Sequence, residues 1–237
     1  MSEKDRIDHA KAYPFPSPGH GFVYEAGDWR ALDGPVARDG RHPVLAAGSN
    51  QSPEQLRRKY ASMPDIGAVL AERGRLHDFD VVYAAHLTAY GSVPATFQHS
   101  PGTAVTVFLL WLTDRQLARM HDTEGNYTYD HLENLRLVLD DGGQLDAAYM
   151  YSSKVGCLNH AGGCVGLAEI AAEGRVFPAL GQVAALELVR DRLGPGTPLD
   201  DFIAEHLADR AVHRERSARL GEGSIPAGYA RRILLEL

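Results

Sequence analysis

The stretch HPVLAAGSNQSPEQLRRKY, residues 42–60, decides how the fold begins. Its first five residues form a short apolar run typical of a buried strand, and Gly48–Asn50 follows as a turn. Ser52 stands where a helix N-cap is expected, with Pro53 at the first helical position and Gln55 completing a capping box. The stretch therefore predicts a strand, a tight turn and a helix in immediate succession.

Short β-like runs dominate the chain beyond this helix. Four of them lie within residues 68–112, and two more lie at residues 131–140 and 144–153. Ser100–Gly102 predicts a hairpin between the last two runs of the first group, and Asp141–Gly143 predicts a hairpin between the later pair. Strands placed so closely along the chain indicate an antiparallel sheet or a small barrel.

A helix is predicted between these two groups of strands, and two more follow them. Thr113 and Gln116 have capping-box spacing, so this helix should begin after Thr113 and end at or near Glu124. Helical patterns also cover residues 180–193 and a longer segment that starts at Thr197-Pro198 and continues to Leu220. The chain thus changes from mainly β to mainly α near its last third.

Composition and charge narrow the classes of partner. The 237 residues carry 24 Lys and Arg against 31 Asp and Glu, a formal charge of −7, which argues against a nucleic-acid partner. We find neither an apolar run of signal-peptide length at the N-terminus nor a stretch long enough to cross a bilayer. Two cysteines do not make a disulfide framework. These features predict a cytoplasmic protein with no membrane partner.

Two short segments carry side chains or backbone suited to chemistry. Gly48, Ser49 and Asn50 form a turn between a strand and a helix, where free backbone amides can hold a carboxylate or carbonyl oxygen. Glu124 lies in HDTEGNYTY, at the expected end of a helix, where the negative end of the helix dipole disfavours an ionised carboxylate. A carboxyl group tuned in this way, beside Tyr127 or Tyr129, is suited to general acid–base catalysis.

Taken together, these segments resemble the γ-glutamylcyclotransferase-like superfamily. AAGSNQSPEQL is similar to the family's strand-and-loop opening, and LTDRQLARMHDTEGNYTY is similar to the segment that carries the family's glutamate. YGSVPATF and DAAYMYSS resemble two further family segments, in the same order along the chain. The resemblance covers roughly residues 44–153. It differs at Ala47, where the family has a tyrosine that can supply a pocket wall or a hydrogen-bond donor.

The resemblance implies an α+β fold, a small mixed β-barrel with flanking helices, here followed by a C-terminal helical extension. We accordingly expect a Pro/Gly-rich arm at residues 1–40, packed on the body of the protein, and a γ-glutamylcyclotransferase-like core at residues 41–155. Residues 156–237 would then be a loop and a helical extension packed on that core.

The resemblance also implies a function. Glu124 would be the catalytic acid and base, and Gly48, Ser49 and Asn50 would bind a γ-glutamyl group, with Tyr129 and Tyr151 as further substrate-binding candidates. The products would be 5-oxoproline and a free amine or amino acid. The substrate is then a small molecule, no cofactor is required because the attacking amine belongs to the substrate, and a homodimer is compatible with the sequence.

Other functions stay open at this point. A non-catalytic member of the same fold would bind a small molecule or a partner in a pocket reshaped by Ala47 and the aromatic arm. A hydrolase, or an accessory domain associated with amide hydrolysis, would act on another amide. Cys157, His160 and Cys164 have a spacing that could supply three ligands to zinc, but a glycine-rich loop is the preferred interpretation and no metal site is predicted.

Overall fold

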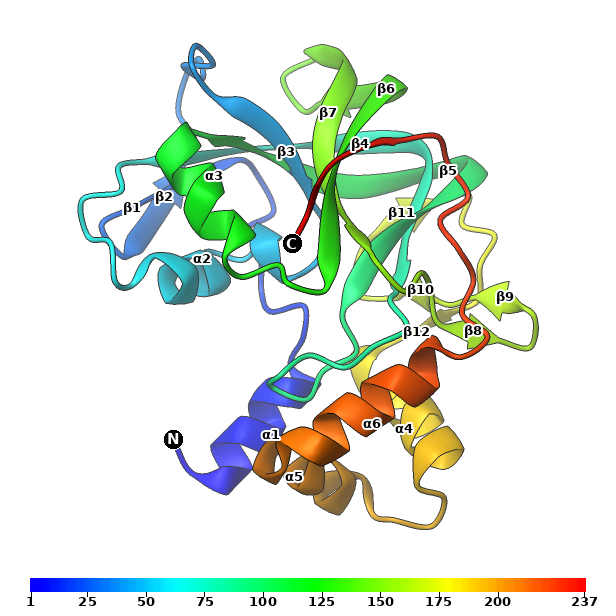
Figure 1. Ribbon diagram of the computed structural model, residues 1–237. Coiled ribbons are helices and arrows are strands. Elements are labelled where there is room, and N and C mark those ends of the chain that lie inside the picture. Colours follow the sequence, from blue (N-terminus) through cyan, green and yellow to red (C-terminus); the bar gives the residue numbers. More distant parts are fainter.

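A computed structural model describes residues 1–237, and at its centre is a closed barrel of five strands (Figure 1). The strand order is β5-β3-β7-β6-β4, and pairing of β4 with β5 closes the ring. Strands β3 and β7 run parallel, whereas the other neighbouring pairs are antiparallel. The barrel strands are β3 (His42–Ala46), β4 (Val69–Tyr83), β5 (Ala95–Leu112), β6 (Tyr127–Leu139) and β7 (Gln144–Ser153). The predicted α+β fold with a small mixed barrel is confirmed.

Shorter strands extend the barrel at its edges. A hairpin of two strands pairs with β4, and the last strand of the chain pairs with β6. The others connect the barrel to the C-terminal helices. These strands are β1 (Phe22–Glu25), β2 (Asp28–Ala31), β8 (Asn159–His160), β9 (Gly163–Cys164), β10 (Gly166–Leu167), β11 (Ala172–Glu173), β12 (Ala179–Leu180) and β13 (Arg232–Glu236).

The helices form two groups around the barrel (Figure 1). Helices α2 (Pro53–Tyr60) and α3 (Asp114–His121) flank one side of the barrel, and a single 3-10 turn, Ser49–Gln51, precedes α2. The second group lies beneath the barrel in this view and consists of α1 (Glu3–Lys11), α4 (Gln182–Leu193), α5 (Leu199–Ala208) and α6 (Arg210–Gly221). None of these helices is both long enough and apolar enough to span a membrane.

The two faces of the barrel strands contribute to two hydrophobic cores. Successive residues of a strand point to opposite faces, so Leu45 joins the larger core, whereas Val44 and Ala46 join the smaller one. The larger core continues into the helices beneath the barrel through residues such as Phe202. The smaller core includes Leu56 of α2 and packs that helix against the barrel.

Strands β4 and β5 correct one sequence prediction. The expected hairpin at Ser100–Gly102 is wrong, because β5 continues through this segment and stays paired with β4 on both sides of it. Asp78 and Gly102 both adopt positive φ, and the Gly102 amide donates to Asp78 Oδ1 at 2.9 Å. The turn-forming residues therefore make a bulge and a bend in a continuous two-stranded ribbon rather than a chain reversal.

Helix boundaries differ from the predictions at three places. The capping box at Thr113 is confirmed, but α3 ends at His121, three residues before Glu124. Ser52 makes no side-chain cap for α2, although Pro53 does occupy the start of that helix. The long helix predicted up to Leu220 is divided at Asp209, whose extended backbone ends α5 and whose side chain accepts the Ala211 amide at the start of α6.

Residues 1–40, which we expected to form an arm, pack closely on the body of the protein. The sequence reading did not anticipate α1 or the pairing of β1 with β4. Several aromatic side chains of this segment are core residues, among them Tyr13, Phe15 and Phe22. Tyr13 of this segment lines the cavity described next.

Candidate functional site

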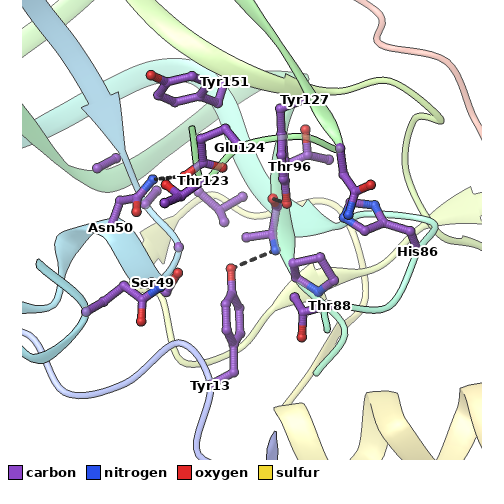
Figure 2. A pocket seen from close by; sticks show the side chains of 18 of the residues that line it. Tyr13, Ser49, Asn50, His86, Thr88, Thr96, Thr123, Glu124, Tyr127 and Tyr151 are labelled. Carbon is purple, nitrogen blue, oxygen red and sulfur yellow. Dashed lines mark hydrogen bonds between the residues drawn. The ribbon is translucent and has the colours of Figure 1, made fainter. Parts of the chain in front are cut away.

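One cavity of about 370 Å³ lies at an end of the barrel, where several loops meet helix α2 and Tyr13 of the N-terminal segment (Figure 2). The end of β3 and the loop at 48–50 form one wall, and residues 123–127 form another. The segment between β4 and β5 contributes residues 86–95, and α2 contributes Gln55 and Lys59. The cavity therefore joins the two segments that the sequence singled out, 74 residues apart in the chain.

Glu124 is a buried carboxylate of this cavity, with 8% of its surface exposed. Asn50 Nδ2 donates to Glu124 Oε1 at 3.0 Å, as Figure 2 shows, and the Lys59 ammonium donates to the same oxygen. Both bonds fall on Oε1. The second oxygen, Oε2, accepts no hydrogen bond from the protein. Oε1 therefore fixes the position of the carboxylate, and Oε2 can interact with a ligand.

Lys59 also lines the cavity, and the sequence did not predict it. Its side chain is 5% exposed and also donates to Thr123 Oγ1 at 2.8 Å. A buried charge needs a partner, and the pairing of Lys59 with Glu124 balances both charges. The spacing of residues along the helix could have revealed its burial. Lys59 lies three residues after the core residue Leu56, so the two side chains share the buried face of α2.

The loop at 48–50 offers backbone donors. The amides of Gly48 and Asn50 donate to no backbone carbonyl, so each can receive a ligand oxygen. Gly48 is required here because a Cβ at this position would collide with the Tyr13 hydroxyl. Backbone amides presented by one loop are a common cradle for carboxylates and oxyanions.

Tyr13 brings a phenol to this loop from the N-terminal segment, and the sequence reading missed it. Its hydroxyl accepts the Ala95 amide at 2.8 Å and also faces the Ser49 amide. Burial raises the pKa of Tyr13 well above its ordinary value, so the phenol keeps its proton. With its lone pairs facing amides, the hydroxyl can donate that proton to a ligand. A phenol therefore stands beside the loop even though Ala47 replaces the tyrosine of the family.

His86 lines the same cavity and was also missed. It is 4% exposed, neither of its ring nitrogens has a hydrogen-bond partner, and its ring lies edge-on to Tyr127 at 5.4 Å between centroids. Burial, together with repulsion from His213, lowers the pKa of His86 to about 4. His86 is therefore neutral at neutral pH. No pattern around it in the sequence marks it.

The other predicted substrate-binding residues are divided between the cavity and the core. Ser49 and Tyr151 line the cavity with Gly48, Asn50 and Glu124. Tyr129 does not line it: its ring stacks on Tyr149 and its buried hydroxyl has no partner.

The cysteine and histidine cluster considered from the sequence does not gather around a point. Cys157 and Cys164 are buried free thiols beside the Gln98 amide, whereas His160 is exposed. The structure contains no group of three side chains arranged to hold a metal ion.

Comparisons with known proteins give matches only among solved structures. No protein-family profile matches the sequence. No curated protein matches it either. An Arabidopsis thaliana protein solved in solution is 20% identical with a TM-score of 0.36, covering 48% of this chain and 70% of that one.

Two further matches span more of the chain. An uncharacterized human protein is 15% identical with a TM-score of 0.40, covering 82% of this chain and 94% of its own. A gamma-glutamyl cyclotransferase is 15% identical with a TM-score of 0.37, covering 81% of this chain and 93% of its own.

Proposed function

We propose that this protein is a γ-glutamyl cyclotransferase, which converts a γ-glutamyl amide to 5-oxoproline and a free amine. The observation that carries the proposal is the meeting of Glu124 with the loop at 48–50, joined by the hydrogen bond from Asn50, inside a cavity of small-molecule size. The motif resemblance supports the same reaction.

In this mechanism Glu124 is the general base and acid. Oε2 takes a proton from the α-ammonium group of the substrate, and the resulting amine attacks the γ-carbonyl carbon of the same molecule. The carboxyl group then returns this proton to the departing nitrogen, which leaves as a neutral amine as the amide bond breaks, and the ring nitrogen loses its second proton to water. No covalent enzyme intermediate is needed, because the nucleophile is part of the substrate and positioning supplies much of the rate.

The loop and Tyr13 bind the substrate oxygens. The amides of Gly48 and Asn50 hold the α-carboxylate, which places the amine near Glu124. The Tyr13 hydroxyl donates to the γ-carbonyl oxygen and stabilises the negative charge that develops there during attack. Asn50 acts twice, because its side chain also fixes the orientation of the Glu124 carboxylate.

The test is a panel of γ-glutamyl amides and γ-glutamyl dipeptides incubated with the purified protein, with 5-oxoproline measured by mass spectrometry. Release of 5-oxoproline together with an equal amount of amine supports the proposal. Release of glutamate instead would identify a hydrolase, because water rather than the α-amine would then be the nucleophile.

A non-catalytic binding protein with the same fold is the second candidate. The observation that favours it is the ion pair of Lys59 with Glu124, because this pairing already engages one oxygen of the carboxylate. Saturable binding of a γ-glutamyl amide, measured by calorimetry, without formation of any product would select this candidate.

Substitution of Tyr13 is expected to lower turnover selectively. Tyr13→Phe removes the hydroxyl and should reduce kcat by about 10²-fold, the usual effect of losing one oxyanion donor. The matched control is Tyr129→Phe, which removes another buried hydroxyl, one outside the cavity and without a hydrogen-bond partner. Steady-state kinetics should show full activity for the control. Equal losses in both variants would contradict the role of Tyr13.

A further inference from the structure

The charges that line the cavity balance one another. Of its 24 lining residues, Lys59 and Glu124 are the only acidic or basic side chains apart from His86, and these two form an ion pair. His86 is neutral at neutral pH, as its environment requires. The remaining polar lining is uncharged and includes the side chains of Gln55 and Asn126.

The cavity offers hydrogen-bond donors for one substrate carboxylate but no unpaired cation for a second one. The α-carboxylate of a γ-glutamyl group is matched by the free amides of Gly48 and Asn50. A leaving group that is a free amino acid brings a second carboxylate, and no unpaired cation lines the cavity to receive it. Moving an unpaired carboxylate out of water costs several kcal/mol, so binding of such a substrate is disfavoured.

Arg58, which does not line the cavity, does not change this conclusion. Arg58 follows the loop on α2 and lies over the Phe15 ring, 5.2 Å from its centroid. Its guanidinium is already paired with Glu54 and contacts His9. A neutral leaving group, by contrast, finds uncharged donors and acceptors: the Asn126 and Gln55 amides, the Thr88 hydroxyl and the Tyr90 hydroxyl.

We propose that the substrate carries an uncharged leaving group, so that the cavity accepts a γ-glutamyl group joined to a neutral amine or to an amino-acid amide in preference to a free amino acid. This inference rests on the proposed function and narrows it to one substrate class. The reaction is unchanged: the α-amine forms the lactam bond, the γ-amide bond breaks, and its nitrogen leaves with the returned proton.

The experiment compares two probes of nearly equal size and shape. γ-Glutamyl-alaninamide and γ-glutamyl-alanine differ in one terminal group, a carboxamide in the first and a carboxylate in the second. We expect kcat/KM for the alaninamide probe to exceed that for the alanine probe by about 10²-fold at pH 7.5, as burial of an unmatched charge predicts. Equal values, or a preference for alanine, would overturn the inference.

A charge variant tests the cause of the preference. Asn126→Lys places a cation in the lining at an exposed position, and it should reduce the preference for alaninamide at least tenfold. Asn126→Gln is the matched control, because it changes the side-chain length without adding charge, and it should retain the preference. A preference that stays the same in the lysine variant would contradict an electrostatic origin.

Binding measurements keep this inference separate from the proposed reaction. If neither probe yields 5-oxoproline, the proposed function fails, and calorimetric titration with both probes still reports the selectivity of the cavity. Tighter binding of γ-glutamyl-alaninamide would support the neutral leaving-group site in that case. Equal or tighter binding of γ-glutamyl-alanine would exclude it.

Discussion

Glu124→Gln is expected to lower the kcat for release of 5-oxoproline by about 10³-fold. The substitution preserves the size of the side chain, and the amide oxygen of glutamine can still accept from Asn50 and Lys59. What is lost is the atom that takes up the substrate proton, and general acid–base catalysis typically contributes 10²- to 10⁴-fold. Single-turnover kinetics, which separate chemistry from binding, are the measurement.

A second variant separates loss of catalysis from loss of stability, because Glu124 also forms an ion pair with Lys59. Glu124→Gln leaves the buried Lys59 ammonium without a counter-charge, at a cost of up to about 3 kcal/mol in the free energy of unfolding. The double variant Lys59→Met, Glu124→Gln removes both charges and should recover stability but not turnover. Glu54→Gln, at a position on α2 whose side chain is 44% exposed, is the matched control and should remain fully active. Turnover within tenfold of wild type in Glu124→Gln would exclude its catalytic role.

Stability is expected to fall steeply in mild acid because two buried histidines must remain neutral. Burial lowers the pKa of His86 and of His206 to about 4, from an ordinary value of 6.5. Tyr127 and His213 face His86, and His213 and Arg216 face His206, so each added proton would lie near an aromatic ring or another basic group.

Because both pKa values are lowered by folding, protonation of these histidines destabilises the folded protein. The unfolded chain binds protons more readily than the folded one, so the contribution of both histidines is complete above about pH 6.5 and is lost as the pH falls towards 4. For His86 the loss is about 3 kcal/mol, and His206 adds to it in the same direction. The loss is a large share of the 5–15 kcal/mol typical of a folded domain.

Urea unfolding at several pH values between 7.5 and 4.5 measures this loss. His86→Leu should reduce the slope of unfolding free energy against pH by about one proton in this range. His160→Gln is the control, because His160 is exposed, and its slope should equal that of wild type. An unchanged slope in His86→Leu would show that His86 does not resist protonation in the folded protein.

The barrel and the two central segments of the site could be predicted from local sequence. Alternation of apolar residues, the Thr113 capping box and the turn at Asp141–Gly143 each act over a few residues, and the structure confirms them. The pairing of the loop at 48–50 with Glu124 was suggested by the resemblance to a family. These features could be predicted because residues close together in the chain determine them.

Other residues of the site could not be predicted because distant parts of the chain position them. Tyr13 reaches the loop through packing of the N-terminal segment on the barrel, and His86 resists protonation because the surrounding fold buries it. The bend at Gly102 failed as a hairpin for a related reason, since the pairing of β4 with β5 on both sides outweighed the local preference for a turn.

The segment between β4 and β5 is held on its outer side by the C-terminal helices. His206 of α5 contacts the Thr88 carbonyl at 2.8 Å, Ser217 of α6 accepts the Leu87 amide at 3.2 Å, and Ser92 donates to the Ala10 carbonyl of α1 at 2.8 Å. Helices α1, α5 and α6 therefore support this wall of the cavity on the side that faces away from a ligand. Changes of ligand preference can therefore arise from substitutions on α5 and α6 that never touch the ligand, which gives protein engineers remote positions for reshaping selectivity.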